Sequence, residues 1–269
     1  MAQQSSPVAL TVAGSDCSAG AGLQADLKTF SALGVFGVTA VTCVVAEVPG
    51  RVLRIEAVDA QNVRDQIELL LAHFPIAAIK TGLLFSPEIV ETVATVLEQS
   101  AQGIPVIVDP VMIATSGDAL LQPAAIEGYC SRLFPRATLV TPNMAEAAAL
   151  TGRRVSNLEE MRVAGNELAQ KFGTRFLLKG GHLGGAQATD LLFGGTAVAE
   201  FSAPFVQGVS THGTGCTYSA AIAARLALGD SLPEAIARAK EFVSRAIRDH
   251  FSWTNSSGEV HALNHERQT

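Results

Sequence analysis

The sequence of 269 residues predicts an α/β fold of three layers, in which helices cover both faces of a central, mostly parallel sheet. Short apolar runs that end in polar or glycine-rich loops alternate with longer segments of helical period. The composition agrees, because 48% hydrophobic residues, 16% charged residues and 24 glycines suit buried strands joined by tight turns. No linker or repeat interrupts the alternation, so we expect one domain over residues 1–269.

Each expected strand is a short run of β-branched and apolar residues. These runs are 8–13, 38–45, 77–84, 106–108, 138–140, 176–178, 188–193 and 198–201. The last two flank Gly194 and Gly195 in the manner of a hairpin. The other strands alternate with helices, which predicts parallel neighbours.

The expected helices have apolar residues at intervals of three and four, and most end at a glycine. They cover 21–33, 59–73, 86–100, 118–133, 143–150, 156–172, an alanine-rich segment between Gly213 and Gly229, and 231–250. The pairs Ser156 with Glu159 and Ser231 with Glu234 have the spacing of capping boxes. Residues 1–6 and about 254–269 are polar, and we expect little structure there.

Net charge and cysteine spacing exclude several classes of function. A formal net charge of −6 provides no basic field for a nucleic acid, so we expect no such partner. The four cysteines form no C-x-x-C pair, and the N-terminus resembles no signal peptide, which indicates a reduced, cytoplasmic protein without structural zinc. The longest apolar stretch, 35–48, contains Gly37, Thr39 and Glu47 and is too short and polar to cross a membrane.

The turn Gly213-Thr214-Gly215-Cys216 precedes the alanine-rich helix and predicts an anion site. Two glycines leave the backbone N–H groups free to face an anion, and the helix N-terminus adds partial positive charge. Cys216 would lie in the first helical turn, where the dipole favours a thiolate. The alternative is an ordinary loop in which Cys216 is a small apolar residue of the core.

Polar residues at three other expected strand ends would meet this turn at the same edge of the sheet. Asp109 follows a very apolar strand, and with Glu146 it could hold Mg²⁺ through water. Lys179 precedes two glycines and could reach phosphate oxygens. Each has a simpler interpretation, because Asn143-x-x-Glu146 is also a capping pattern and Lys179 could extend to solvent.

The first loop, 14–22, is rich in glycine but lacks the order G-x-G-x-x-G. A dinucleotide-dependent oxidoreductase is therefore disfavoured. Asp26, on the helix that follows, could hydrogen-bond a small ligand at the strand ends, or could simply favour the start of that helix. Together these residues indicate a site for a nucleotide, Mg²⁺ and a small alcohol.

Five segments taken together resemble the hydroxymethylpyrimidine/phosphomethylpyrimidine kinases of thiamine biosynthesis, within the ribokinase superfamily. They are AGSDCSAGAGLQADLKTFSALGVFG, DPVMIATSGDALL, VTPNMAEAAALTG, LLKGGHL and STHGTGCTYSAAIAA, in this order over nearly the whole chain. The resemblance implies a ribokinase-like fold without a large lid domain. It also implies phosphorylation of 4-amino-5-hydroxymethyl-2-methylpyrimidine and then of its monophosphate, with ATP as co-substrate and Mg²⁺, in a cytoplasmic homodimer.

The resemblance also implies a role for each matching residue. Gly213, Thr214, Gly215 and Cys216 would form the anion hole, with Cys216 in the place of the aspartate base of related sugar kinases. Lys179 would contact the phosphates, with Thr211 and His212 beside the phosphate tail. Asp109 and Glu146 would organise Mg²⁺. Gly14, Asp26, Glu47, Leu83 and Val111 would line the pyrimidine pocket.

One segment departs from the family pattern. Where the family usually has Ala-Gln-Asn-Thr, this chain has Ala46-Glu47-Val48-Pro49. A glutamine amide can both donate and accept, whereas an ionised carboxylate only accepts, so one ring nitrogen would lose a donor at a cost of about 1–3 kcal/mol. Glu47 would match the hydrogen-bonding groups of the pyrimidine if the carboxylate or the ring were protonated, or if a water molecule lay between them. The alternative is that Glu47 faces solvent and has no role.

This departure keeps two other functions open. Glu47 could pair with the protonated pyridine nitrogen of vitamin B6, which makes a pyridoxal or pyridoxine kinase, or an enzyme with both activities, the main alternative. Cys216 could attack the aldehyde of pyridoxal and so suits both substrates. A nucleotide-responsive binding protein without catalysis is disfavoured, because Lys179, Asp109 and the glycine turn are intact.

Overall fold

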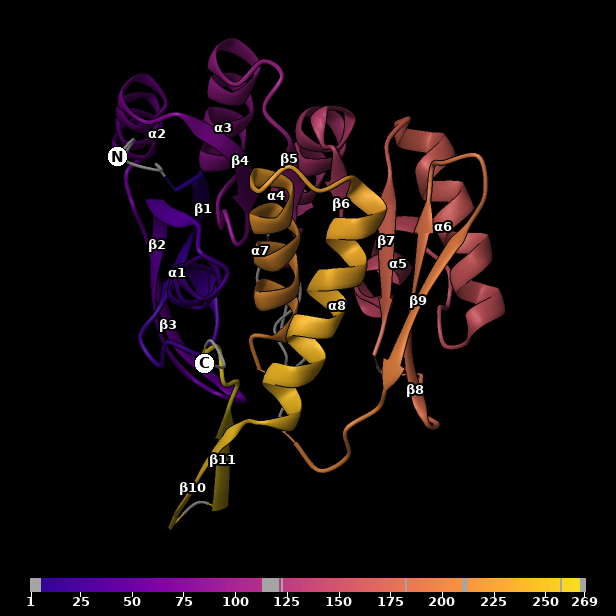
Figure 1. The fold of residues 1–269 in the computed structure, drawn as a ribbon. Helices are drawn as coiled ribbons and strands as arrows, with labels where there is room; N and C mark the ends of the chain where they lie inside the picture. Colours follow the sequence, from indigo (N-terminus) through magenta and orange to yellow (C-terminus); the bar gives the residue numbers. More distant parts are fainter. Residues whose placement is uncertain are drawn as a thin grey trace, which may run out of the picture.

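One mostly parallel sheet extends through the described part of the chain (Figure 1). The structure is a computed structural model that describes residues 6–112, 121, 123–181, 183–209, 212–256 and 258–266. The strand order is β3-β2-β1-β4-β5-β6-β7-β8-β9. The strands are β1 (Val8–Asp16), β2 (Phe36–Val48), β3 (Arg51–Ala57), β4 (Ile76–Thr81), β5 (Val106–Val108), β6 (Leu139–Val140), β7 (Phe176–Gly180), β8 (Gln187–Phe193) and β9 (Ala199–Pro204). From β2 to β7 all neighbours are parallel, and β3, β8 and β9 are antiparallel.

Helices cover both faces of this sheet. They are α1 (Gly22–Ala32), α2 (Ala60–His73), α3 (Pro87–Ser100), α4 (Pro123–Gly128), α5 (Met144–Thr151), α6 (Leu158–Phe172), α7 (Thr214–Ala227) and α8 (Leu232–Arg248). Helices α1, α7 and α8 pack on one face around Phe30, Ile222 and Phe242, and α2 to α6 pack on the other (Figure 1). The three-layer α/β fold expected from the sequence is confirmed.

Two local predictions need correction. The sequence predicts no strand between 46 and 58, yet Arg51–Ala57 forms β3, whose charged residues are tolerated because the strand lies at the sheet edge. The N-cap of α6 is Asn157, whose side chain accepts from the Glu160 N–H at 2.9 Å, so the cap begins one residue after the predicted Ser156. Asparagine and serine are equally good N-caps, so adjacent candidates are ambiguous in sequence.

The C-terminal segment is more ordered than the sequence predicts. The strands β10 (Phe251–Asn255) and β11 (Gly258–Ala262) form a hairpin that projects from the body of the molecule (Figure 1). After the hairpin, Leu263 and His265 are buried, and the Nε2 of His265 lies 2.9 Å from the Thr217 hydroxyl of α7. The expected lack of structure from about residue 254 is therefore corrected for the described residues.

The buried His265 makes the protein's stability depend on pH. Burial lowers its pKa to about 4, below the 6.5 of an exposed histidine, so the unfolded chain binds more protons between these pH values. We expect the free energy of unfolding to fall by on the order of 2–3 kcal/mol as the pH decreases through this window. Urea denaturation of the wild type and His265→Gln checks this. The variant should lose this part of the pH dependence, and the exposed His73→Gln should keep it.

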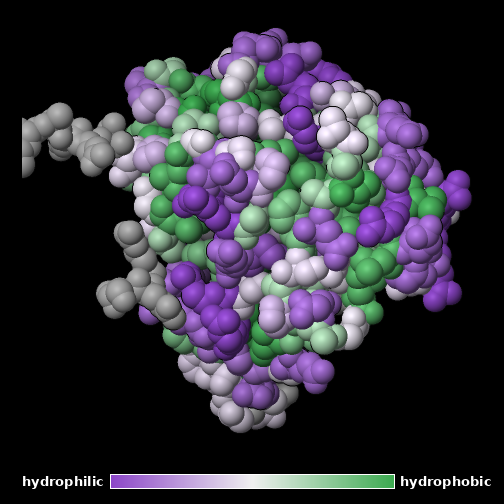
Figure 2. Space-filling model, turned by 45° about the vertical axis from the view of Figure 1, so that its right-hand side comes forward, coloured by the Kyte–Doolittle hydropathy of each residue, from purple (hydrophilic) through white to green (hydrophobic). Residues whose placement is uncertain are grey.

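No described helix is long and apolar enough to cross a bilayer. Figure 2 shows hydrophilic residues over much of one side of the molecule, with smaller hydrophobic areas between them.

Candidate active site

The predicted site residues meet at a cavity of about 750 Å³ at the carboxyl ends of the parallel strands. Those that line it are Gly14, Glu47, Leu83, Asp109, Val111, Glu146, Lys179, His212, Gly213, Thr214, Gly215 and Cys216. Thr211 lies outside the described residues, and Asp26 does not line the cavity. The residues predicted at strand ends thus line one cavity, at the edge where ligands of open α/β sheets bind.

The turn from Gly213 to Cys216 begins α7 and borders the cavity. Gly213 has a φ of 80°, and a Cβ there would lie 1.8 Å from the carbonyl oxygen of Gly20. A Cβ on Gly215 would lie 3.1 Å from the Nζ of Lys179. Glycine is therefore required at 213, whereas a side chain at 215 would only press on the Lys179 ammonium. The N–H groups of the first helical turn remain available to an anion.

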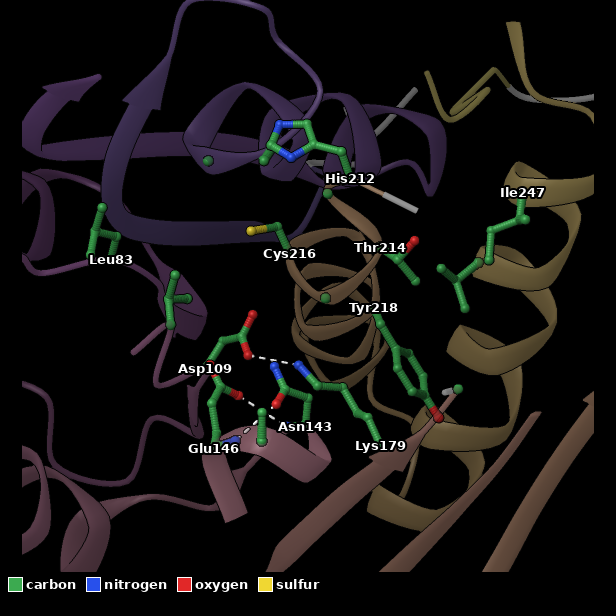
Figure 3. Close-up of a pocket in the computed structure, with 18 of the residues that line it drawn as sticks. Leu83, Asp109, Asn143, Glu146, Lys179, His212, Thr214, Cys216, Tyr218 and Ile247 are labelled. Carbon is green, nitrogen blue, oxygen red and sulfur yellow. Dashed lines mark hydrogen bonds and ion pairs between the residues drawn. The ribbon is translucent and has the colours of Figure 1, made fainter. Parts of the chain in front are cut away.

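The hydroxyl of Thr214 supports a ligand site beside this turn. It is buried and has no hydrogen-bond partner in the described residues. Figure 3 shows Thr214 on the side of α7 that faces Ile247 of α8, with Cys216 on the other side of the same helical turn. A buried hydroxyl without a partner is costly, and a bound polar ligand would remove that cost.

An ion pair between Asp109 and Lys179 lies next to the turn. The Nζ of Lys179 is 2.9 Å from Oδ1 of Asp109, which also accepts from the Thr141 hydroxyl at 3.1 Å. The Ser219 hydroxyl of α7 donates to Oδ2 at 3.2 Å. Three elements thus hold one buried carboxylate, and these hydrogen bonds offset the cost of its burial.

The protonation of this cluster follows from burial and charge. Burial disfavours the ionised Asp109, but the ammonium groups of Lys179 and Lys80 outweigh it and lower the pKa. Burial likewise disfavours charged Lys179, yet Asp109 and Glu146 raise its pKa. Burial raises the pKa of Glu146, although Lys179 opposes this. Lys179 is therefore positive and Asp109 negative at neutral pH.

Glu146 makes the capping contacts that the sequence suggested, and its carboxylate also lines the cavity. Its Oε2 accepts from the Asn143 N–H at 2.8 Å and its Oε1 accepts from the Met112 N–H at 3.1 Å, so it is part of a capping box at the start of α5. Each oxygen retains a lone pair. The carboxylates of Asp109 and Glu146 are hard oxygen ligands, and their engaged lone pairs fit a hydrated Mg²⁺ better than one they coordinate directly.

The thiol of Cys216 lines the cavity, but it is not activated as the sequence suggests. Burial raises its pKa to about 11, and the nearby Lys80 opposes this only in part. The expectation that the helix dipole favours a thiolate is wrong for the protein without ligands, because desolvation outweighs the dipole. The thiol is protonated at neutral pH.

Asp26 occupies a different position from the one predicted. It is fully buried and accepts from the Nζ of Lys80 at 2.8 and 3.0 Å and from the Thr11 hydroxyl at 2.5 Å. Lys80, which sequence reasoning missed, lines the cavity in its place. The available signal was a lysine within the otherwise apolar strand 77–84, since a buried lysine requires a partner.

His212, beside the turn, belongs to a second polar group. Its Nε2 lies 3.2 Å from Oδ2 of Asp16, and the polar atoms of Asp16, Glu47 and His212 all lie within 4.8 Å of one another. A Cβ on Gly20 would lie 2.9 Å from the His212 ring, so the loop after β1 packs tightly against it. The sequence placed Glu47 in the pyrimidine pocket and His212 beside the phosphates, so it predicted neither their proximity nor the part of Asp16.

Beyond Thr214, the cavity has a largely apolar wall that the sequence did not predict. Lys240 of α8 binds Oδ2 of Asp190 of β8 at 2.6 Å and lies 5.7 Å from the ring centre of Tyr218. The Tyr218 hydroxyl is buried without a hydrogen-bond partner in the described residues. The apolar lining is Val206, Val209, Val243 and Ile247. Apolar walls with a few polar groups are typical of small-molecule sites.

Several known proteins are similar to this chain over most of its length. The sequence profile described as phosphomethylpyrimidine kinase matches residues 16–261. A hydroxymethylpyrimidine/phosphomethylpyrimidine kinase of Rhizobium meliloti is 42% identical over 94% of this chain and 96% of its own. The thiamine biosynthesis bifunctional protein ThiED of Geobacter sulfurreducens is 45% identical over 89% of this chain, which spans 49% of that relative. The solved pyridoxal kinase of Staphylococcus aureus with ADP superposes with a TM-score of 0.87 at 36% identity, over 97% of this chain and 94% of that one.

Proposed function

The chain belongs to the phosphomethylpyrimidine kinase family, and from this premise we propose that it phosphorylates 4-amino-5-hydroxymethyl-2-methylpyrimidine and then its monophosphate, using ATP, for thiamine biosynthesis. The observation that carries the proposal is the position of the glycine turn, 213–216, beside Lys179 in one continuous cavity. The cavity extends from this point in both directions, toward Glu47 and Leu83 and toward Ile247. A phosphoryl group at the turn would lie between two bound molecules.

The two ends of the cavity suit different ligands. The end near Gly14, Leu83 and Val111 would take the pyrimidine, with its hydroxymethyl group directed to the turn. The apolar end between α7 and α8 would take the nucleotide, and the free hydroxyl of Thr214 would face it. Holding both reactants in one geometry supplies much of the rate enhancement in phosphoryl transfer.

The residues at the turn would stabilise charge on the transferred group. The N–H groups of 213–216 and the Lys179 ammonium would contact its oxygens, and they are held in place before the substrate binds. Asp109 and Glu146 would hold hydrated Mg²⁺, which neutralises phosphate charge when bound. Catalysis in this proposal rests mainly on position and charge.

Pyridoxal is the second candidate substrate. Two observations favour it: the similarity to a solved pyridoxal kinase, and Glu47 at the position where the related pyrimidine kinases usually have glutamine. A carboxylate can pair with one protonated ring nitrogen. The same phosphoryl site would serve both alcohols.

The test is kcat/KM with MgATP for hydroxymethylpyrimidine, its monophosphate and pyridoxal on one preparation. Substantial turnover of both pyrimidines is expected. Turnover of pyridoxal alone would show that the proposed pyrimidine substrate is wrong, while phosphoryl transfer from ATP would stand. Ligand binding without turnover of any of the three would indicate a binding protein.

Loss of the Cys216 thiol is expected to reduce the rate more than the binding. In Cys216→Ala we expect kcat to fall by about 10²-fold with a nearly unchanged KM, because a proton acceptor acts in the transition state and not in substrate binding. Since the thiol pKa is about 11, kcat of the wild type should also rise with pH more steeply than kcat of the variant. Cys130→Ala is the matched control. Equal loss of kcat and pyrimidine affinity would contradict a role in the rate.

We also propose a cytoplasmic homodimer, as the resemblance implies. All four cysteines are free, which suits a reducing compartment. The edge strand β3 has an open side, and its Leu53 is 73% exposed, which favours a contact with a second copy. Light scattering of the purified protein measures the assembly.

A further inference from the structure

Glu47, Asp16 and His212 form a compact group at the pyrimidine end of the cavity. Their polar atoms lie within 4.8 Å of one another, and Glu47 and His212 line the cavity whereas Asp16 does not. Glu47 is fixed from behind, because its backbone N–H and carbonyl both hydrogen-bond the Cys17 thiol, at 3.3 and 3.2 Å. Since Glu47 also lines the cavity, its carboxyl group is within reach of a heterocycle bound there.

Within this group, Asp16 carries a negative charge and lies outside the lining of the cavity. Its oxygens accept from the N–H groups of Ser18, Gly20 and Ala21 at 2.7, 3.1 and 2.7 Å, and from the Ser18 hydroxyl at 3.0 Å. Burial disfavours its ionisation, but hydrogen bonds from His212, Ser18 and Ala21 outweigh burial and lower its pKa to about 2. Oδ2 alone accepts four hydrogen bonds with that from His212, so it has no free lone pair for a metal ion.

The surroundings of Glu47 favour its protonated form. Burial raises its pKa, the adjacent Asp16 raises it further, and His212 opposes this. The other titratable groups around it are the thiols of Cys17 and Cys43 and the guanidinium groups of Arg51 and Arg54 on β3. In the β2–β3 register Glu47 is opposite Val52, and the two arginines are opposite Ala46 and Val48.

A neutral aminopyrimidine and an ionised Glu47 carboxylate are poorly matched in hydrogen bonding. The edge of the aminopyrimidine presents an amino N–H donor next to a ring nitrogen that accepts, so an ionised carboxylate meets one donor and one repelling lone pair. One added proton resolves this. Either the ring nitrogen is protonated and donates to the carboxylate, or a protonated Glu47 donates to the ring nitrogen while its other oxygen accepts from the amino group.

We propose that Glu47 recognises the aminopyrimidine edge by sharing one proton with its ring nitrogen, so that the substrate binds together with a proton. This inference rests on the proposed substrate. The two hydrogen bonds are the same whichever partner carries the proton. Glutamine at this position would make both bonds without a proton, because its amide donates and accepts.

The consequence is a pH-dependent affinity of defined sign. Above the pKa values of both Glu47 and the ring nitrogen, one proton is taken up on binding, so Kd rises about tenfold per pH unit. Between the two values Kd is level, and below the lower one it rises again as the pH falls, because one of two bound protons must then be released. In Glu47→Gln, Kd should stay level in the alkaline range and become about 100-fold lower than that of the wild type two units above both pKa values.

Isothermal calorimetry with hydroxymethylpyrimidine, without nucleotide, tests this in buffers of different ionisation enthalpy at alkaline pH. We expect about one proton taken up by the wild type and by the control Glu56→Gln, whose side chain is on the exposed edge strand, and none by Glu47→Gln. Kd of each protein across the pH range is the second readout.

Uptake that is absent in the wild type, or that persists in Glu47→Gln, would overturn the inference, and persistence would place the proton on His212 or another group. Either result, with normal turnover of the pyrimidine, leaves the proposed function intact. No binding or turnover of the pyrimidine by any of the three proteins would overturn both.

Discussion

Replacement of Lys80 by methionine is expected to lower the free energy of unfolding by about 3–5 kcal/mol, because it leaves the buried Asp26 without its partner. Both side chains are fully buried, with Nζ 2.8 and 3.0 Å from the two carboxylate oxygens. Burial disfavours the charged lysine, yet Asp26 and Asp109 raise its pKa. Burial also raises the pKa of Asp26, although Lys80 opposes this, and the two hydrogen bonds from Nζ to both carboxylate oxygens are those of an ion pair. Urea denaturation of Lys80→Met measures the loss.

A double mutant separates the pair from general disruption of the core. Lys80→Met combined with Asp26→Asn removes both charges, and we expect it to be more stable than Lys80→Met alone. The exposed Lys28→Met should change the free energy of unfolding by less than about 0.5 kcal/mol. A loss below about 1 kcal/mol in Lys80→Met, with Asp26 intact, would show that the ion pair contributes little.

The position of the site was predictable from sequence because it depends on local features. A strand that ends in Gly14, Asp109 or Lys179 can be recognised in its own segment, and parallel strands bring such ends to one edge. The turn at Gly213 was recognisable for the same reason. The fold class required only the alternation of strands and helices.

The partner of each charge was not predictable, because it depends on contacts between distant segments. Asp26 and Lys80 are 54 residues apart, and nothing in the local sequence of either shows that the two form an ion pair. The pKa of Cys216 was misjudged for a related reason, since helix position is visible in sequence whereas burial is not. The edge strand β3 was missed because its alternation is obscured by exposed charges.

Replacement of Lys179 by methionine is expected to reduce kcat by about 10²–10³-fold, the usual cost of removing one fixed charge-stabilising donor. Lys179 lies next to the glycine turn, with 3.1 Å between its Nζ and a Cβ on Gly215, and it also binds Asp109 at 2.9 Å (Figure 3). Its removal leaves Asp109 and Glu146 facing a phosphate without this charge. The KM for the pyrimidine, which binds at the other end of the cavity, should change by less than about threefold.

The control must show that lost charge at the phosphoryl site, and not misfolding, causes the effect. Lys179→Met combined with Asp109→Asn removes the unpaired carboxylate, so stability should recover while activity stays low, since neither substitution restores a cation at the turn. The exposed Lys171→Met, at the end of α6, should keep wild-type kcat. If Lys179→Met keeps more than about a tenth of wild-type kcat, the N–H groups of the turn carry the stabilisation, because they are then the remaining donors that face the transferred group.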